Sequence, residues 1–331
     1  MIKTILVPLD GSPLAEHILR LVRPLARRTE AHIVLVAAVV PTHTWLGAEE
    51  PRDEESASAG AALESIRQSL NAEGLKASVK VMSGKAADCI RDAATSEGAD
   101  IIAMTSHGRS GLPRLVTGSV TDEVIRTAPE PVLVLRASEL EPDDLEINEI
   151  LVALDGSPLS ESIIPVVEGM AQQLGASILL VRAVTPSTLL FLSEFIPSSP
   201  PALDEIEAKA KRYLEGIAKK IRQSGIKVKT DVATDYAAEA IIDVATRKSV
   251  DLIAIGTHAR SVAGRLVMGS TADNVARHSP KPCLLIRPVE VAAPEGEQRE
   301  GVVEIVPGVE EAAIVIPPPD WPESEDPAPQ R

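Results

Sequence analysis

The chain repeats itself, and this repeat constrains its fold more than any other feature. Residues 5–16, ILVPLDGSPLAE, return at 150–161 as ILVALDGSPLSE, an offset of 145 positions with two substitutions. A second match pairs SHGRSGLPRLVTGSVTDEVIR at 106–126 with THARSVAGRLVMGSTADNVAR at 257–277, at an offset of 151. Matches of this length at nearly the same spacing indicate a duplicated structural unit.

A third match closes both units with the same kind of segment. APEPVLVLR at 128–136 corresponds to SPKPCLLIR at 279–287, again at an offset of 151. The sequence therefore predicts two homologous domains, at 1–137 and 147–288. With 331 residues, 44% of them apolar, the chain has enough material for two packed cores.

Within each unit, apolar runs alternate with amphipathic stretches, which is typical of βαβ construction. The continuous aliphatic runs suit the strands of a parallel sheet that is covered by helices on both faces. We therefore expect an α/β fold with two tandem, Rossmann-like open sheets of five mainly parallel strands each. The strands predicted in the first unit are 3–9, 32–40, 76–82, 100–104 and 131–136.

Each unit begins with a strand that runs directly into a helix signal. Ser12-Pro13 and Ser157-Pro158 place a hydroxyl N-cap before a proline at the first helical position. Asp10 and Asp155 therefore stand at the carboxyl ends of these first strands. An aspartate before Gly-Ser-Pro also has a structural interpretation, because its carboxylate accepts hydrogen bonds from nearby backbone N–H groups and stabilises the corner.

The composition changes after Pro288. Residues 289–331 hold eleven Asp or Glu, two Arg and eight Pro, and such a segment cannot build a core of its own. We expect an acidic, proline-rich, disordered tail. Its two apolar segments, 302–306 and 313–316, are open to two interpretations: they dock on the folded domains or another protein, or they are inert.

Overall charge and aromatic content argue against a nucleic-acid partner. The formal net charge is −15, whereas proteins that track phosphate backbones carry clustered Lys and Arg. Two Phe, two Tyr and two Trp offer no platform for stacking bases.

Other features indicate a cytoplasmic protein without a membrane segment. No apolar run of about 18 residues occurs, and Met1 leads directly into the first predicted strand without a secretory leader. Cys89 and Cys283 stand alone, without metal-ligand spacing, so we expect two buried thiols.

Glycine-containing loops follow the fourth predicted strand of each unit. The first unit reads Thr105-Ser-His-Gly108, then nine residues, then Gly118-Ser119. The second reads Gly256-Thr-His-Ala259, then nine residues, then Gly269-Ser270. In an open α/β sheet, ligands bind at the carboxyl ends of the strands, where glycine lets a phosphate approach the backbone and a helix N-terminus attracts its charge. Both Gly-Ser pairs are also ordinary helix starts.

The spacing G-x2-G-x9-G-[ST] after the fourth strand resembles the ATP-site pattern of the universal stress protein family, and the resemblance covers almost all of residues 1–288. Thr105 replaces the first glycine of the pattern in the first unit, and Ala259 replaces the second glycine in the second unit. Each departure adds a side chain near the expected phosphates, while the x9 spacing and the final Gly-Ser are intact in both units.

The resemblance implies an ATP site in each unit. By analogy, Asp10 and Asp155 approach the adenine or ribose, and Ala38 and Ala183 line the adenine pocket. Magnesium arrives with the nucleotide. The phosphates are held by the glycine loops and the helix starts that follow them, with two arginines as additional donors: Gly108, Arg109, Gly118, Ser119, Val120, Gly256, Arg260, Gly269, Ser270 and Thr271. The arginines have a second interpretation as solvated surface residues.

Together with these features, the resemblance favours an adenine-nucleotide-binding regulatory protein of the stress response without efficient catalysis. The sequence has no Walker loop, and no nucleophile with a matched base accompanies His107 or His258, which we interpret as loop-positioning residues. A nucleotide-independent interaction scaffold of the same family is the alternative, favoured by Thr105 and Ala259. An adenylating enzyme of a related fold is less favoured, because the first strand ends in Asp-Gly-Ser-Pro.

The resemblance also bears on assembly. Single-domain relatives commonly dimerise through their fifth strands, so 131–136 and 282–287 are expected to pair within this chain as a pseudo-two-fold unit. Further self-association and protein partners stay open.

Overall fold

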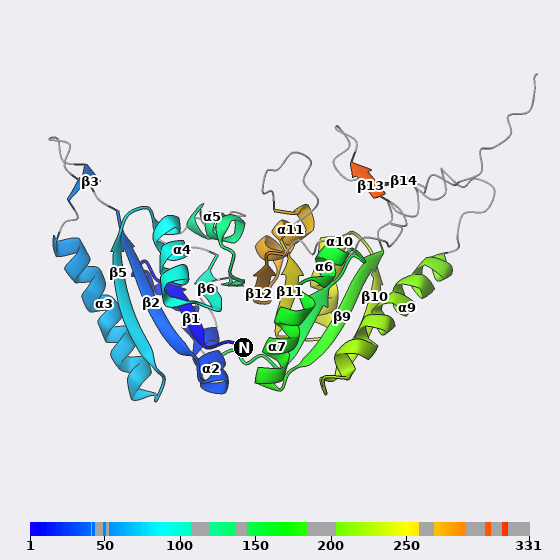
Figure 1. Cartoon of the computed structure of the whole chain (residues 1–331), viewed down its shortest axis with the longest axis horizontal. Coiled ribbons are helices and arrows are strands. Elements are labelled where there is room, and N and C mark those ends of the chain that lie inside the picture. The colour runs from blue at the N-terminus through cyan, green and yellow to red at the C-terminus, as the bar shows by residue number, and fades with distance from the viewer. Residues whose placement is uncertain are drawn as a thin grey trace, which may run out of the picture.

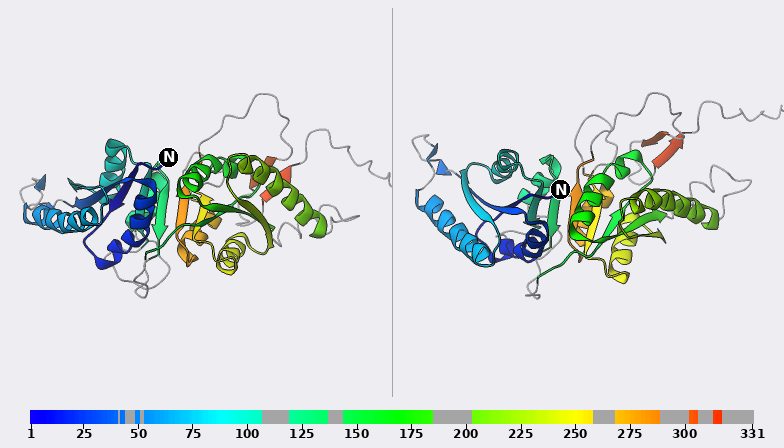
Figure 2. Two further views of the ribbon diagram at one scale, coloured as in Figure 1. Left: turned by 90° about the horizontal axis from the view of Figure 1, so that it is seen from below. Right: turned by 60° about the horizontal axis from the view of Figure 1, so that its bottom comes forward.

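The computed structural model describes residues 1–40, 42–43, 49–50, 53–106, 119–136, 144–184, 203–257, 268–288, 302–305 and 313–316. Its main feature is one twisted sheet of ten strands with helices on both faces (Figure 1, Figure 2). The α/β architecture predicted from the alternating pattern is confirmed.

The first half contributes five strands to the large sheet. They are β1 (Thr4–Pro8), β2 (His32–Val39), β5 (Ala77–Ser83), β6 (Ile101–Thr105) and β7 (Val132–Leu135). The helices between them are α1 (Pro13–Glu16), α2 (Leu19–Thr29), α3 (Asp53–Ala72), α4 (Ala86–Glu97) and α5 (Ser119–Thr127). Two short strands, β3 (Thr42–His43) and β4 (Glu49–Glu50), pair with each other before α3.

The second half repeats this order. Its strands are β8 (Glu149–Ala153), β9 (Ser177–Val184), β10 (Val228–Thr234), β11 (Leu252–Gly256) and β12 (Cys283–Ile286). Its helices are α6 (Pro158–Glu161), α7 (Ile164–Leu174), α9 (Leu203–Arg222), α10 (Ala237–Arg247) and α11 (Ser270–His278).

The sheet runs in the order β10-β9-β8-β11-β12-β7-β6-β1-β2-β5. Within each half, every neighbouring pair of these strands is parallel. At the centre, β7 and β12 pair antiparallel, with Leu133 opposite Leu284. The predicted pairing of the two fifth strands is therefore confirmed, and it joins the two halves into one sheet.

Successive side chains of each strand point to opposite faces of the sheet and pack in two separate cores. Ile5 and Val7 of β1 pack with α2 and α3, whereas Leu6 packs on the other face with α4 and α5. The second half uses the same alternation, with α7 and α9 on the first face and α10 and α11 on the other. Each core contains residues of both halves, because the sheet is continuous through β7 and β12.

Two side chains form hydrogen bonds between the halves where α2 packs against α7, below the β7–β12 pair in Figure 1. Gln173 of α7 accepts a hydrogen bond from the Ile2 N–H at 2.7 Å and donates one to the Ile2 carbonyl at 2.8 Å. Arg28 of α2 donates to the Ile147 carbonyl at 2.8 Å and to the Leu174 carbonyl. Arg28 and Gln173 occupy equivalent positions of the repeat. Each therefore bonds to the backbone just before the first strand of the other half, at Ile147 and Ile2 respectively.

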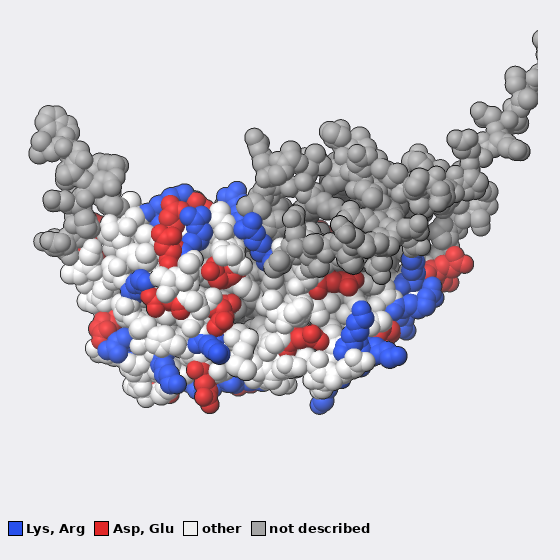
Figure 3. All heavy atoms as spheres, viewed as in Figure 1, with Lys and Arg blue, Asp and Glu red and all other residues white. Residues whose placement is uncertain are grey.

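Charged side chains of both signs are interspersed on the face drawn in Figure 3. One of their contacts also joins the halves. Arg277 of α11 pairs with Asp273 on its own helix at 2.8 Å and with Asp122 of α5 at 3.6 Å.

Both cysteines are buried and free, as the sequence predicts. Burial raises the pKa of the Cys283 thiol to about 12, and burial also raises the pKa of Cys89. Among the residues that the structure describes, no helix is both long enough and apolar enough to cross a bilayer.

Most of the predicted disordered tail, 289–331, lies outside the described residues. Within it the structure describes β13 (Val302–Ile305) and β14 (Ala313–Ile316), which pair antiparallel with each other. The two apolar segments of the tail therefore meet each other in a two-stranded sheet.

Replacing Arg28 by alanine is expected to lower the free energy of unfolding by about 2 kcal/mol, because charged donors to carbonyls of the other half are lost. Arg27→Ala is the matched control: its side chain is 52% exposed and reaches Glu73 at 3.4 Å, so its loss is expected to cost less than about 1 kcal/mol. Urea unfolding measures both. Equal losses for the two variants would contradict the assigned role of Arg28.

Candidate functional site

The order of the strands reverses beside the first strand of each half. From β1 the chain moves outward to β2 and β5, then returns to the other side of β1 with β6 and β7. The second half does the same around β8. The carboxyl ends of the strands at such a reversal are where open α/β sheets bind ligands. We call the residues placed there the first carboxyl edge (Asp10, Ala38, Ser119 and Val120) and the second carboxyl edge (Asp155, Ala183, Gly269, Ser270 and Thr271).

The turn after β8 is built from local hydrogen bonds. The Oδ1 atom of Asp155 accepts from the Ser157 N–H at 2.8 Å, and Ser157 caps α6 by accepting from the Ser160 N–H at 3.1 Å. Gly156 between them has φ +89°, a left-handed conformation that favours glycine.

The turn after β1 has the same construction. Asp10 accepts from the Ser12 N–H at 2.9 Å, Ser12 accepts from the Ala15 N–H at 3.1 Å, and Gly11 has φ 76°. The predicted serine caps and the structural interpretation of both aspartates are thus confirmed. Both carboxylates are on exposed residues, so the turns hold them at the surface of the strand ends.

Ala38 and Ala183 lie one residue before the carboxyl ends of the neighbouring strands β2 and β9. Ala38 lies opposite Met82 on β5, and Ala183 lies opposite Ala233 on β10. Each is half-buried. Backbone hydrogen bonds from Leu9 to Val36 at 2.8 Å and from Leu154 to Val181 at 2.9 Å hold the aspartate turns beside these strand ends.

The helix that follows the second loop starts at the same edge. Gly269 is the N-cap of α11 with an ordinary φ of −62°, and its N–H donates to the Thr257 carbonyl at 2.9 Å, which ties the helix start to the end of β11. Ser270 is exposed and Thr271 is half-buried. The N–H groups of a first helical turn have no partner within the helix and carry a positive partial charge.

In the first half, α5 is tied to its strand through a side chain. Thr121 donates to the Thr105 carbonyl at 2.9 Å, and both residues are buried. Ser119 is exposed and Val120 is half-buried, like their equivalents in the second half. Gly108, Arg109, Gly118 and Arg260, together with the two loop histidines, lie outside the described residues.

The glycine pattern suggests open space for a phosphate beside Gly256, but protein atoms lie close to it. A Cβ atom added to it would meet Pro288 at 3.3 Å and Ile163 at 3.6 Å. The space beside this glycine is therefore filled by the chain itself at the end of β11.

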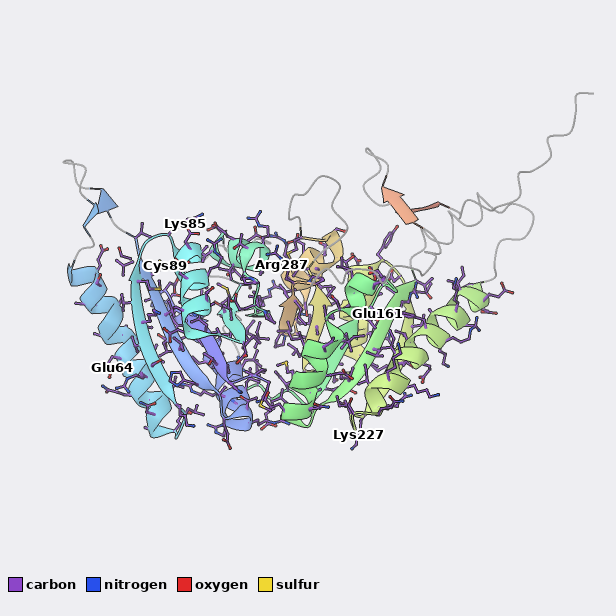
Figure 4. The ribbon with its side chains drawn as sticks, viewed as in Figure 1. Glu64, Lys85, Cys89, Glu161, Lys227 and Arg287 are labelled. Atoms are coloured by element: carbon purple, nitrogen blue, oxygen red, sulfur yellow. The ribbon has the colours of Figure 1, made fainter. Side chains whose placement is uncertain are left out.

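The second half also contains a cluster of side chains that the sequence pattern did not predict. The guanidinium of Arg182, on β9, lies 4.9 Å from the ring centre of Tyr213 on α9. It also packs on the turn, since a Cβ on Gly156 would come within 2.8 Å of the Arg182 Nη1 atom. The Tyr213 hydroxyl donates to Glu161 Oε1 at 2.9 Å, and burial, with this hydrogen bond, raises the pKa of Tyr213 above its ordinary value. Figure 4 labels Glu161 at the end of α6.

A signal for this cluster is present in the sequence. Residues 32–39 read HIVLVAAV and residues 177–184 read SILLVRAV, so an arginine stands in an otherwise aliphatic strand where the first unit has Ala37. A charged residue at such a position requires a specific environment, because burial of an unpaired charge is costly.

The chemistry available at these edges is the binding of a polar, anionic ligand. Carboxylates accept from hydroxyl and amino groups, and the first turns of α5 and α11 donate to oxygen anions. Among the described residues, no group of three or more His, Cys, Asp or Glu could hold a metal ion.

Replacing Gly156 by alanine is expected to lower the free energy of unfolding by about 1–3 kcal/mol, because the turn needs a positive φ; the new methyl group would also displace the guanidinium of Arg182 from the turn. Gly169→Ala is the control: a Cβ at this position in α7 meets nothing within 4 Å, so a gain of about 0.5–1 kcal/mol is expected. Thermal unfolding measures the loss of stability in Gly156→Ala and the gain in Gly169→Ala. A neutral Gly156→Ala variant would contradict this description of the turn.

Comparison with known proteins agrees with this architecture. The model of the universal stress protein family matches residues 1–136 and again 146–287. A solved universal stress protein from Archaeoglobus fulgidus superposes with a TM-score of 0.67 at 20% identity, covering 86% of this chain and 98% of that one. This likeness shows the fold.

Curated relatives carry the same family name. A universal stress protein of Mycobacterium tuberculosis is 26% identical over 198 residues, which cover 58% of this chain and 63% of the relative, less than two thirds of its length. The universal stress protein YxiE of Bacillus subtilis is 30% identical over 146 residues, which cover 42% of this chain and 99% of the relative. With the family model matched in both halves, the chain belongs to the universal stress protein family and carries two tandem domains of it.

Proposed function

We propose that this chain binds an adenine nucleotide, ATP with its magnesium ion, at its carboxyl edges and acts as a regulatory protein of the stress response. The observation that carries the proposal is the convergence at the second carboxyl edge. The Asp155 turn and the start of α11 come from distant parts of the sequence and follow the carboxyl ends of the adjacent strands β8 and β11, beside one strand reversal.

The phosphates are assigned to the helix starts. At α11 the N–H groups of Ser270 and Thr271 belong to the first turn, where an anion gains both hydrogen bonds and the favourable end of the helix dipole. Ser119 and Val120 offer the same arrangement at α5. Binding of this kind needs no lysine, and the magnesium ion is carried by the phosphates themselves.

The base and ribose are assigned to the aspartate turns. In the second half, Oδ1 of Asp155 is used by the Ser157 N–H, and a carboxylate has a second oxygen with which to accept from a ribose hydroxyl or an adenine amino group. The small side chain of Ala183 leaves room for a ring at the neighbouring strand end. Asp10 and Ala38 take these roles in the first half.

We propose binding without efficient turnover. The residues assigned to the two edges are turn, small and helix-start residues, whereas efficient phosphoryl transfer uses a positioned base and fixed cations around the transferred group. The nucleotide then acts by favouring one conformation or partner, and we place this role in the cytoplasm. A nucleotide-independent scaffold is the second candidate, favoured by Gly256, whose neighbouring space is filled by Pro288 and Ile163.

Calorimetric titration with magnesium-ATP is expected to give saturable binding that loses one site in Gly269→Val and the other in Gly118→Val, because a branched side chain blocks each phosphate position. Gly269 has an ordinary φ, so valine there does not strain the backbone. Gly216→Val is the control, since Gly216 is exposed on α9 and a Cβ there meets nothing within 4 Å.

The absence of nucleotide binding by the unmodified chain would contradict the proposal. If the unmodified chain gives no binding heat and millimolar magnesium-ATP does not raise its melting temperature, no nucleotide is bound, and the scaffold function takes its place.

A further inference from the structure

The two carboxyl edges are not equivalent, and three of the differences between the halves concern one turn. Three positions of the repeat that hold alanine in the first half hold polar or charged side chains in the second. Ala15 corresponds to Ser160 and Ala37 to Arg182 at the offset of 145, and Ala62 corresponds to Tyr213 at the offset of 151. All three second-half side chains lie around Asp155 and Gly156 or support a residue that does.

Ser160 acts on the turn from α6. Its Oγ atom accepts from the Asp155 N–H at 3.3 Å and donates to the Ser157 carbonyl at 2.9 Å. It therefore bridges the two ends of the turn. Alanine at the equivalent position of the first half has no hydroxyl and cannot make this bridge.

Arg182 acts on the turn from β9. A Cβ on Gly156 would lie 2.8 Å from Nη1 and 2.9 Å from both Cζ and Nη2, so the flat guanidinium lies directly against the glycine. The Tyr213 ring, 4.9 Å from Cζ, supports it by a cation–π contact. No carboxylate among the described residues lies within ion-pair distance of Arg182, so packing on the turn and the ring accounts for its position.

Tyr213 is itself anchored. Its hydroxyl donates to Glu161 at 2.9 Å, and Glu161 belongs to the same short helix as Ser160 (Figure 4). The cluster thus connects β9, α9 and α6 around one turn. In the first half, the buried Ala37 and the exposed Ala62 supply no side chain long enough to make these contacts.

We propose that Arg182 is a positioning residue for the second carboxyl edge: it holds the Asp155 turn in place and thereby makes nucleotide binding in the second half dependent on a contact that the first half lacks. The inference rests on the proposed function. A turn that is already ordered loses less conformational freedom when a ligand binds, and this difference appears as affinity.

The test uses the full chain with Gly118→Val, so that only the second half binds. In this background, Arg182→Ala is expected to weaken magnesium-ATP binding about tenfold, which corresponds to about 1.4 kcal/mol. Adenosine, measured by competition against ATP, is expected to lose affinity by the same factor, because Asp155 is assigned to the base and ribose. Arg247→Ala, which removes an exposed arginine paired with Asp243, is the control and leaves both affinities unchanged.

A double-mutant cycle separates positioning from general destabilisation. With Asp155→Asn already present, Arg182→Ala is expected to change the affinity less than twofold, because its effect acts through the Asp155 carboxylate. If the two substitutions weaken the affinity by independent factors, so that the double variant shows their product, the proposal is overturned. A loss for ATP without a loss for adenosine would also overturn it, since Arg182 would then contact the phosphates.

The two proposals fail in different ways. If the unmodified chain binds no nucleotide, the proposed function is refuted and this inference with it. If the unmodified chain binds and Arg182→Ala binds equally well in the Gly118→Val background, only the inference is refuted. Thermal unfolding of each variant establishes that the compared proteins are folded at the titration temperature.

Discussion

The antiparallel pairing of β7 with β12 is the interaction on which the rest of the structure depends. An edge strand exposes unpaired N–H and C=O groups, and pairing the two fifth strands removes two such edges at once. It also makes the core on each face of the ten-stranded sheet continuous across both halves. The reciprocal contacts of Arg28 and Gln173 then fix the halves at the starts of β1 and β8. The two carboxyl edges lie on either side of this joint, one strand further out, because β6 separates β1 from β7 and β11 separates β8 from β12.

The Asp-Gly-Ser-Pro turn shows how a local motif prepares a site. Serine caps the helix and proline starts it, so the chain leaves the strand in one direction. The aspartate stabilises the same turn and still presents its carboxylate at the surface of the strand end. The structural role does not exclude the proposed ligand role, because the Ser157 N–H bonds to only one carboxylate oxygen of Asp155. The second half adds Arg182 and Ser160 to this arrangement, where the first half has Ala37 and Ala15, so the two edges are unequal.

Much of this fold was predictable because its determinants are local. Aliphatic runs marked all five strands of the first half to within about one or two residues, and serine followed by proline marked the helix starts. Local patterns did not predict that the helix after Ser12 ends at Glu16 and resumes at Leu19. They also did not reveal that Gly256 packs against Pro288, or that Arg182 lies between Gly156 and Tyr213, since these contacts join residues distant in the sequence. The ligand roles of Asp10, Ala38, Asp155 and Ala183 stay predictions.

The central claim is that a nucleotide binds at the strand ends that carry the aspartate turns and the starts of α5 and α11. Backbone hydrogen–deuterium exchange with and without magnesium-ATP tests it most directly, because it reports on the N–H groups assigned to the phosphates. The account predicts slower exchange at residues 270–272 or 119–121 together with the turn of the same half, at 155–157 or 10–12, and unchanged exchange at the outer strands β5 and β10. Protection elsewhere, or no protection at either helix start while ATP is bound, would contradict it.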